Sequence, residues 1–174
     1  MRKWCVALAL LLLLSGCGKT EKYETVMDQT VMPEKEDKMV IMLDLPDNAS
    51  LQTMESTADC NVYICDDYTL TAYTADGGDI HKTILEATGF PPEQLDIIRT
   101  QQGDWKRYVC VWAAAGEPGE LVGRCAVLDD GSYHYVLTAM SDAEAAGELS
   151  QNEWQSVFRS FRLINQEDVV SSGS

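Results

Sequence analysis

Residues 105 to 140 read WKRYVCVWAAAGEPGELVGRCAVLDDGSYHYVLTAM. The stretch predicts three strands joined by two tight turns, because runs typical of strands alternate with short turn-forming segments. Asp130-Gly131 is a strong signal for a two-residue type I′ turn, in which both central positions need a positive φ. The GEPG segment at 116–119 is a weaker signal, since proline limits the turn types that are possible. We therefore expect an antiparallel meander here.

The register of the first two strands would bring two cysteines together. If Gly116 faces Gly119 across the turn, Cys110 lies directly opposite Cys125. The Cα atoms of directly opposite residues are about 4.5–5.5 Å apart, a separation that a disulfide accepts. We expect a Cys110–Cys125 disulfide; four buried free thiols are the alternative, which would suit an anaerobic host.

Cys60 and Cys65 form a second candidate pair. On one continuous strand their side chains would point to opposite faces, so a disulfide between them requires a turn near Asn61. Neither pair has the C-x-x-C spacing of a redox site, and no helix N-terminus is placed to lower the pKa of a thiol. Four cysteines can pair in three ways, so the pairing stays open.

Two helices are predicted, one before and one after the meander. The segment at 79–89 has Asp79 as a helix N-cap and Gly89 as a stop signal. Its apolar face consists of Ile80, Ile84 and Leu85. The second helix carries large apolar residues at i, i+3, i+4 and i+7, a spacing that places them on one buried face. These residues are Trp154, Val157, Phe158 and Phe161.

Further strand-like segments complete the domain, and they lie at 39–48, 61–67, 68–76 and 95–100. The order is strands, a helix, three or four antiparallel strands, and a helix. This order predicts an α+β domain over residues 39–164, built as a single antiparallel sheet with helices packed on it.

The N-terminal segment has the layout of a secretory signal peptide: Arg2 and Lys3 precede an apolar run at 4–14 that ends in small residues. Eleven apolar residues cover only about half of a ~30 Å hydrocarbon core, so we do not expect a permanent membrane span. The sequence LSGC at 14–17 is similar to the lipobox of bacterial lipoproteins. That resemblance implies a diacylglyceryl group on Cys17, cleavage before it, and an extracytoplasmic protein anchored in the cell membrane.

The expected organisation follows from these assignments. Residues 1–16 are the signal peptide, and 17–38 comprise the lipidated cysteine and a flexible charged tether. Residues 39–164 are the globular domain, and 165–174 are a disordered tail.

Charge narrows the range of partners. The chain has 13 Lys and Arg against 28 Asp and Glu, a net charge of −15, and the net charge without residues 1–16 is −17. Nucleic acid and anionic membrane surfaces would both repel such a chain. We therefore expect no nucleic-acid partner, and membrane contact through the Cys17 anchor alone.

The sequence gives little sign of catalysis. Its two histidines, His81 and His134, are not grouped with cysteines at zinc-ligand spacing. His134 lies between two tyrosines in a predicted strand, and no G-x-S-x-G motif accompanies it. The turn at 129–131 lacks the further oxygen ligands of a calcium loop. We therefore expect no catalytic residues, no metal and no cofactor.

From about residue 79 to 163 the layout resembles the PsbP-like fold. The resemblance rests on four segments: GGDIHKTILEATGF, RYVCVWAAAG, DDGSYHYVLTAM and EWQSVFRSFRL. In such families a final helix ending in Ser-Phe often closes the domain, which here would be Ser160-Phe161. The resemblance implies an accessory or scaffold role without enzymatic activity.

The functional expectation is a membrane-anchored extracytoplasmic lipoprotein. It would act as a non-enzymatic accessory or binding module for an envelope protein or a ligand, with a groove between helix and sheet as one possible site. The alternative, from another class, is an extracytoplasmic thiol–disulfide oxidoreductase that uses Cys60 and Cys65.

Overall fold

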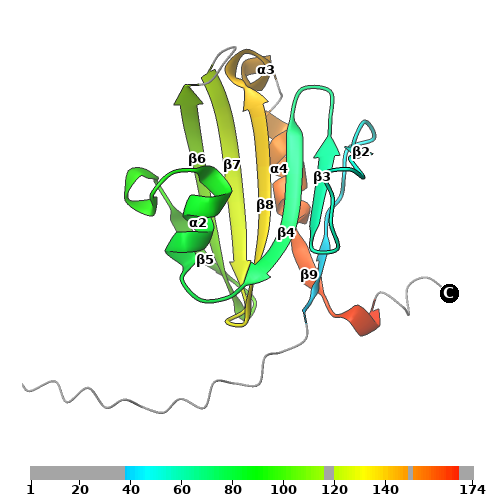
Figure 1. Ribbon diagram of the computed structural model, residues 1–174, viewed down its shortest axis with the longest axis vertical. Coiled ribbons are helices and arrows are strands. Elements are labelled where there is room, and N and C mark those ends of the chain that lie inside the picture. The colour runs from blue at the N-terminus through cyan, green and yellow to red at the C-terminus, as the bar shows by residue number, and fades with distance from the viewer. Residues whose placement is uncertain (1–37, 116–119, 149–150, 169–174) are drawn as a thin grey trace, which may run out of the picture. The chain divides into compact units, whose positions relative to one another are not determined.

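The central feature of the computed structural model is a seven-stranded antiparallel sheet (Figure 1). The structure describes residues 38–115, 120–148 and 151–168. The strands lie in the order β2-β3-β4-β8-β7-β6-β5. Their bounds are Ser50–Leu51 for β2, Cys60–Ile64 for β3, Thr69–Asp76 for β4, Ile98–Gln102 for β5, Trp105–Ala115 for β6, Glu120–Asp129 for β7 and Tyr133–Asp142 for β8.

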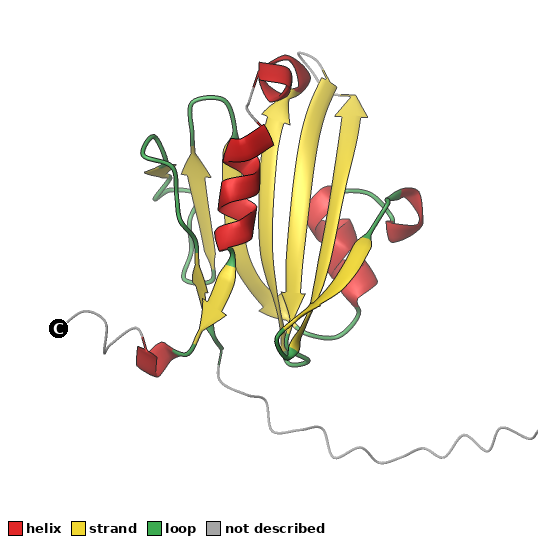
Figure 2. Ribbon diagram, turned by 180° about the vertical axis from the view of Figure 1, so that it is seen from behind, coloured by secondary structure: helices red, strands yellow, loops and turns green. Residues whose placement is uncertain are grey.

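A second, two-stranded sheet corrects the expectation of a single sheet. Here β1 (Val40–Met42) pairs with β9 (Arg162–Ile164), and Ile41 lies opposite Leu163. The chain reaches β9 only after a helix that lies on one face of the main sheet, so β9 lies away from the plane of that sheet (Figure 2). The first strand therefore pairs with the last one instead of extending the main sheet.

The register predicted for the meander is confirmed. Cys110 lies opposite Cys125, and Trp112 lies opposite Gly123. The GEPG turn itself falls outside the described residues. The second turn differs from the prediction: Asp129 pairs with His134, which centres the turn on residues 131 and 132.

The reason for that difference is the backbone of the turn. Only Gly131 there has a positive φ, of 93°, as a type II′ turn requires at its first central position. The Asp130 carboxylate instead accepts hydrogen bonds from the backbone N–H groups of Ser132 and Tyr133. The aspartate therefore supports the turn from just before its centre.

Helix α2 (Ile80–Thr88) covers one face of the sheet. Its caps are as predicted: Asp79 accepts a hydrogen bond from the His81 N–H, and Gly89 has a φ of 77°. Ile84 is buried, whereas Leu85 is 42% exposed and does not belong to the buried face. The residues that form the core under α2 are Ile84, Cys110, Trp112, Cys125, Val127 and Val136.

Helix α4 (Gln151–Ser160) lies on the opposite face, and its predicted apolar side is confirmed. Val157 and Phe158 are almost fully buried, as is Phe161 just beyond the helix. Full burial of such side chains contributes about 1.5–3 kcal/mol each. They pack with Leu128, Tyr135 and Leu137 from the sheet.

Three short helical segments complete the fold: the 3₁₀ turn η1 (Pro92–Gln94), α3 (Ala143–Glu148) and a single turn at residues 166–168. None of the helices in the described ranges is long and apolar enough to span a bilayer. The molecule is thus a twisted sheet with a different helix on each face.

Candidate functional site: an inter-sheet cleft

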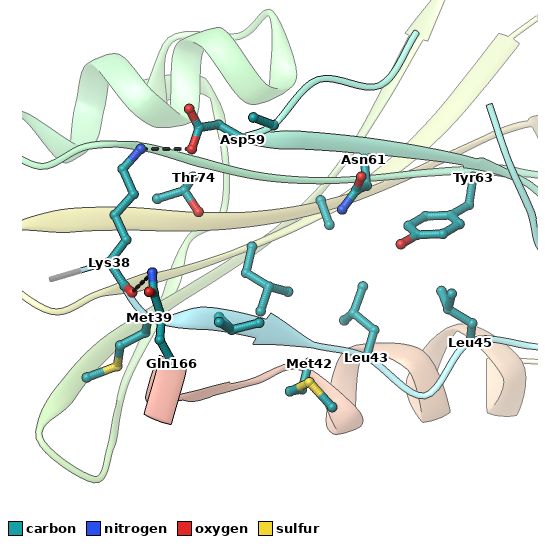
Figure 3. A pocket seen from close by; sticks show the side chains of 14 residues that line it. Lys38, Met39, Met42, Leu43, Leu45, Asp59, Asn61, Tyr63, Thr74 and Gln166 are labelled. Carbon is teal, nitrogen blue, oxygen red and sulfur yellow. Dashed lines mark hydrogen bonds and ion pairs between the residues drawn. The ribbon is translucent and has the colours of Figure 1, made fainter. Parts of the chain in front are cut away.

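A cleft of about 360 Å³ lies between β1 and the face formed by β3 and β4 (Figure 3). We call it the inter-sheet cleft. It is not the groove between helix and sheet that the sequence suggested, because the strand segment at 38–45 forms one wall. Its lining residues are Lys38, Met39, Val40, Ile41, Met42, Leu43, Leu45, Ala58, Asp59, Asn61, Tyr63, Ala72, Thr74 and Gln166.

One end of the cleft is polar and charged. Lys38 Nζ lies 2.8 Å from Asp59 Oδ1, and the Gln166 amide donates a hydrogen bond to the Lys38 carbonyl oxygen (Figure 3). The hydrogen bond to Asp59 raises the pKa of Lys38. The two side chains of this ion pair are 39% and 58% exposed, so water screens the pair and a ligand can replace either partner at little cost.

The other end of the cleft is apolar. Leu43 and Leu45 from the segment after β1 lie at this end, across the cleft from Tyr63 of β3 (Figure 3). Leu45 is 37% exposed, so part of this surface is in contact with solvent. The cleft can therefore hold a molecule with a polar or charged end and an apolar end.

A buried tyrosine fixes the position of β1. The Tyr135 hydroxyl accepts a hydrogen bond from the Met39 N–H and donates one to the Asp130 carboxylate. Burial raises the pKa of Tyr135, so the hydroxyl keeps the proton that it donates. At the far end, the Asp44 N–H donates to Ser160 Oγ. The wall of the cleft is therefore attached to the core at both ends.

The sequence did not predict this cleft. The sequence predicts Lys38 in the tether and Gln166 in the tail, one on each side of the expected 39–164 domain. The structure brings them together because β1 and β9 pair. No local sequence pattern predicts a contact across 128 residues; the strand propensity of residues 39–43 and 162–164 was the only available signal.

The Cys110 and Cys125 thiols lie next to each other beneath α2 and are not bonded. They are 4% and 1% exposed. Their shared hydrogen bond and burial raise the pKa of Cys125 well above its ordinary value. The expected register is confirmed, while the disulfide itself stays a prediction.

Cys60 and Cys65 are not brought together. Cys60 begins β3 and Cys65 follows its last residue, so the turn near Asn61 that a bridge requires is replaced by continuous strand. Cys65 is buried in the core on the α4 side, and Cys60 is half-buried beside Tyr73. Burial raises the pKa of Cys60, which makes its thiolate less available. The oxidoreductase alternative therefore has no paired thiols at these positions.

His134 is part of a buried polar contact between α2 and the sheet. Its Nδ1 shares a 2.7 Å hydrogen bond with Thr83 Oγ1, and its Nε2 lies 3.9 Å from Asp129 Oδ1. Burial lowers the pKa of His134, against the opposing effect of Asp129. The histidine and the threonine are 1% and 5% exposed, so this Thr-His-Asp arrangement holds α2 in place and is closed to a substrate.

His81 lies elsewhere, exposed on α2, with its Nδ1 3.9 Å from Glu93. Over the described ranges the structure brings together no group of three or more His, Cys, Asp or Glu side chains that could hold a metal ion. The Asp129 and Asp130 carboxylates accept hydrogen bonds from backbone N–H groups of their own turn.

Comparison with known proteins rests on fold alone. No protein-family model matches the sequence, and no curated protein matches it either. LpqN of Mycobacterium tuberculosis, described as involved in cell envelope biogenesis, is similar in structure with a TM-score of 0.50 and 14% identity. The match covers 72% of this chain and 84% of LpqN.

Two further solved structures are similar. A protein of Bacteroides thetaiotaomicron matches with a TM-score of 0.50 and 9% identity over 73% of this chain, but over only 46% of that longer chain. Cyanobacterial PsbP from Synechocystis matches with a TM-score of 0.48 and 12% identity, over 72% of this chain and 92% of PsbP. A PsbP protein is thus among the structural neighbours, although a TM-score below 0.5 is too low to establish a shared topology.

Proposed function

We propose that this protein is a membrane-anchored, extracytoplasmic lipoprotein that acts as a non-enzymatic binding module, and that it holds an envelope component in the inter-sheet cleft. The observation that carries the proposal is the cleft itself. Its volume of about 360 Å³ is near the lower end of the range for small-molecule sites. Its charged and apolar ends would orient an amphipathic molecule.

The location is supported by the N-terminal sequence. A basic start, a short apolar run and LSGC suit lipid attachment at Cys17. Two acyl chains anchor a protein stably, because each buried CH₂ contributes ~0.8 kcal/mol. The likeness to LpqN, which is involved in cell envelope biogenesis, agrees with such a location. The bilayer is then one partner, and the molecule in the cleft is the other.

Mass spectrometry of the native protein tests the anchor. We expect the mature chain to begin at Cys17 and to carry a diacylglyceryl group, and to fractionate with membranes. The Cys17→Ser variant should keep its N-terminal segment uncleaved and lack the lipid. An unmodified thiol at position 17 in the native protein would refute the anchor.

Native mass spectrometry of the full chain from its own membranes tests the cleft. We expect a non-covalent adduct that is lost in Asn61→Trp, because Asn61 lines the cleft and a larger side chain fills it. The matched control is Gln101→Trp, also on an exposed strand position but in β5, outside the cleft. An adduct that survives Asn61→Trp, or is lost equally in both variants, contradicts binding in the cleft.

A further inference from the structure

Three arginines from different elements converge around α4. The Arg124 guanidinium of β7 lies 4.7 Å from the centre of the Phe158 ring. The Arg107 guanidinium of β6 donates a 2.6 Å hydrogen bond to the Phe158 carbonyl oxygen. Arg159 lies next to Phe158 in the helix and is exposed. We call these three residues the arginine cluster.

Among the described residues, the arginine cluster has no acidic partner. Within the described parts of the chain, no carboxylate forms an ion pair with any of the three, although the protein has 28 acidic residues. Arg107 also donates to Gln102, and Arg159 donates to Gln155. Four other cations do pair with a carboxylate: Lys38, Lys82, Lys106 and Arg162.

Arg124 has the least satisfied side chain of the cluster. Its Nε is buried without a hydrogen-bond partner among the described residues. Stacking on Phe158 accounts for the position of the guanidinium but leaves this donor desolvated, which costs free energy. Burial and the nearby charge of Arg159 both lower the pKa of Arg124. Burial and Arg124 do the same to the pKa of Arg107. A bound anion would offset the repulsion between these positive charges.

An exposed apolar strip adjoins the cluster. Val111 lies directly opposite Arg124 and is 57% exposed, and Ile98 lies opposite Val109 and is 65% exposed. Directly opposite side chains lie on the same face, so this strip and Arg124 share one surface. Figure 2 shows α4 to one side of β6 on this face, and among the described residues no helix lies over the part of β6 that carries the exposed Val111.

We propose that the arginine cluster and this strip form a second binding site, for a small molecule that carries a phosphate or carboxylate head and a short apolar group. Arg124 and Arg159 hold the head, because guanidinium groups bind both anions through paired, charge-assisted hydrogen bonds. Val111 and Ile98 contact the apolar group. The ligand is a free molecule and not an anionic bilayer, because a chain with a net charge of −15 is repelled by such a surface.

Isothermal titration calorimetry tests this site, with the full chain held in zwitterionic phosphatidylcholine nanodiscs and butyl phosphate as the probe. We expect saturable binding of one equivalent, and at least tenfold weaker binding of butanol and of inorganic phosphate. Arg124→Gln should weaken butyl phosphate binding at least tenfold. The matched control is Arg99→Gln, since Arg99 lies on the other face of β5 against Tyr108.

A second variant keeps the test valid if Arg124→Gln fails to fold. Val111→Glu places a negative charge on an exposed position beside the cluster. This charge repels the anionic head of the ligand, so the substitution should weaken binding without unfolding the protein. The proposal is overturned if butyl phosphate does not bind, if Arg124→Gln and Val111→Glu bind it as tightly as the wild type, or if Arg99→Gln loses as much affinity. It is also overturned if inorganic phosphate binds as tightly as butyl phosphate.

Discussion

The two faces of the main sheet differ in how completely the chain covers them. Under α2, the polar groups contact one another: His134 is bonded to Thr83, and the Cys110 thiol lies against that of Cys125. On the α4 side, the helix covers only the middle of the sheet. The inter-sheet cleft lies against β3 and β4, and the arginine cluster takes two of its three residues from β6 and β7.

This difference suggests a division of roles. The α2 face stabilises the fold, whereas the α4 face presents surfaces with unsatisfied charge and exposed apolar side chains. Substitutions under α2 should therefore change stability and leave binding unchanged. Substitutions on the α4 side should affect binding, except at the residues that hold α4 itself.

The largest effect is expected where α4 meets the sheet. Phe158→Ala removes a fully buried ring that also contacts Arg124, and it should lower the free energy of unfolding by about 3–5 kcal/mol. Urea unfolding followed by circular dichroism measures this loss. A loss below about 1 kcal/mol would show that α4 is not the closure of this face.

The next largest effect is expected from overpacking the core under α2. A Cβ on Gly123 would overlap the Trp112 ring, so Gly123→Ala must displace that ring. We expect a loss of about 1–3 kcal/mol in the free energy of unfolding, the usual cost of overpacking. The double variant with Trp112→Leu should recover part of the loss. Equal stability of Gly123→Ala and wild type would contradict the close contact.

A smaller effect should appear as a pH dependence. Burial lowers the pKa of His134 in the folded state, so the unfolded state takes up a proton first as the pH falls. Stability is then complete above the unfolded pKa of about 6.5, and it decreases as the pH drops below that value. His134→Gln should flatten this part of the curve of unfolding free energy against pH. An unchanged slope in the variant would assign the dependence to other groups.

The smallest effect on stability is expected at the mouth of the cleft. Asp59→Asn removes the carboxylate that raises the pKa of Lys38, so that pKa should fall towards its ordinary value. The midpoint of thermal unfolding should stay the same, since the pair is exposed. Titration of Lys38 Nζ by nuclear magnetic resonance measures the pKa, and calorimetry measures the midpoint of thermal unfolding. A pKa that does not change would mean that the two side chains do not pair in solution.

Local patterns predicted the parts of the fold that local interactions determine. The caps Asp79 and Gly89 bounded α2, and the assumed pairing of Gly116 with Gly119 gave the register that places Cys110 opposite Cys125. The turn after β7 was predicted one residue too early. Asp130-Gly131 also occurs where the aspartate precedes the turn and binds its backbone N–H groups.

Long-range pairing accounts for what the sequence did not predict. The cleft depends on β1 pairing with β9, and neither strand carries a signal that selects this partner over the edge of the main sheet. Part of the arginine cluster can be predicted from the sequence, since the predicted register already places Arg124 opposite Val111. Its third member could not be inferred, because the position of α4 on the sheet depends on packing.

Hydrogen–deuterium exchange tests the contrast between the two faces most directly. The full chain isolated from its own membranes is compared before and after bound molecules are removed. We predict that bound molecules slow exchange at residues 38–45 and 59–63 around the cleft, while residues 80–88 of α2 exchange equally in both samples. Slower exchange at α2 without any change around the cleft would contradict the assignment of binding to the α4 side.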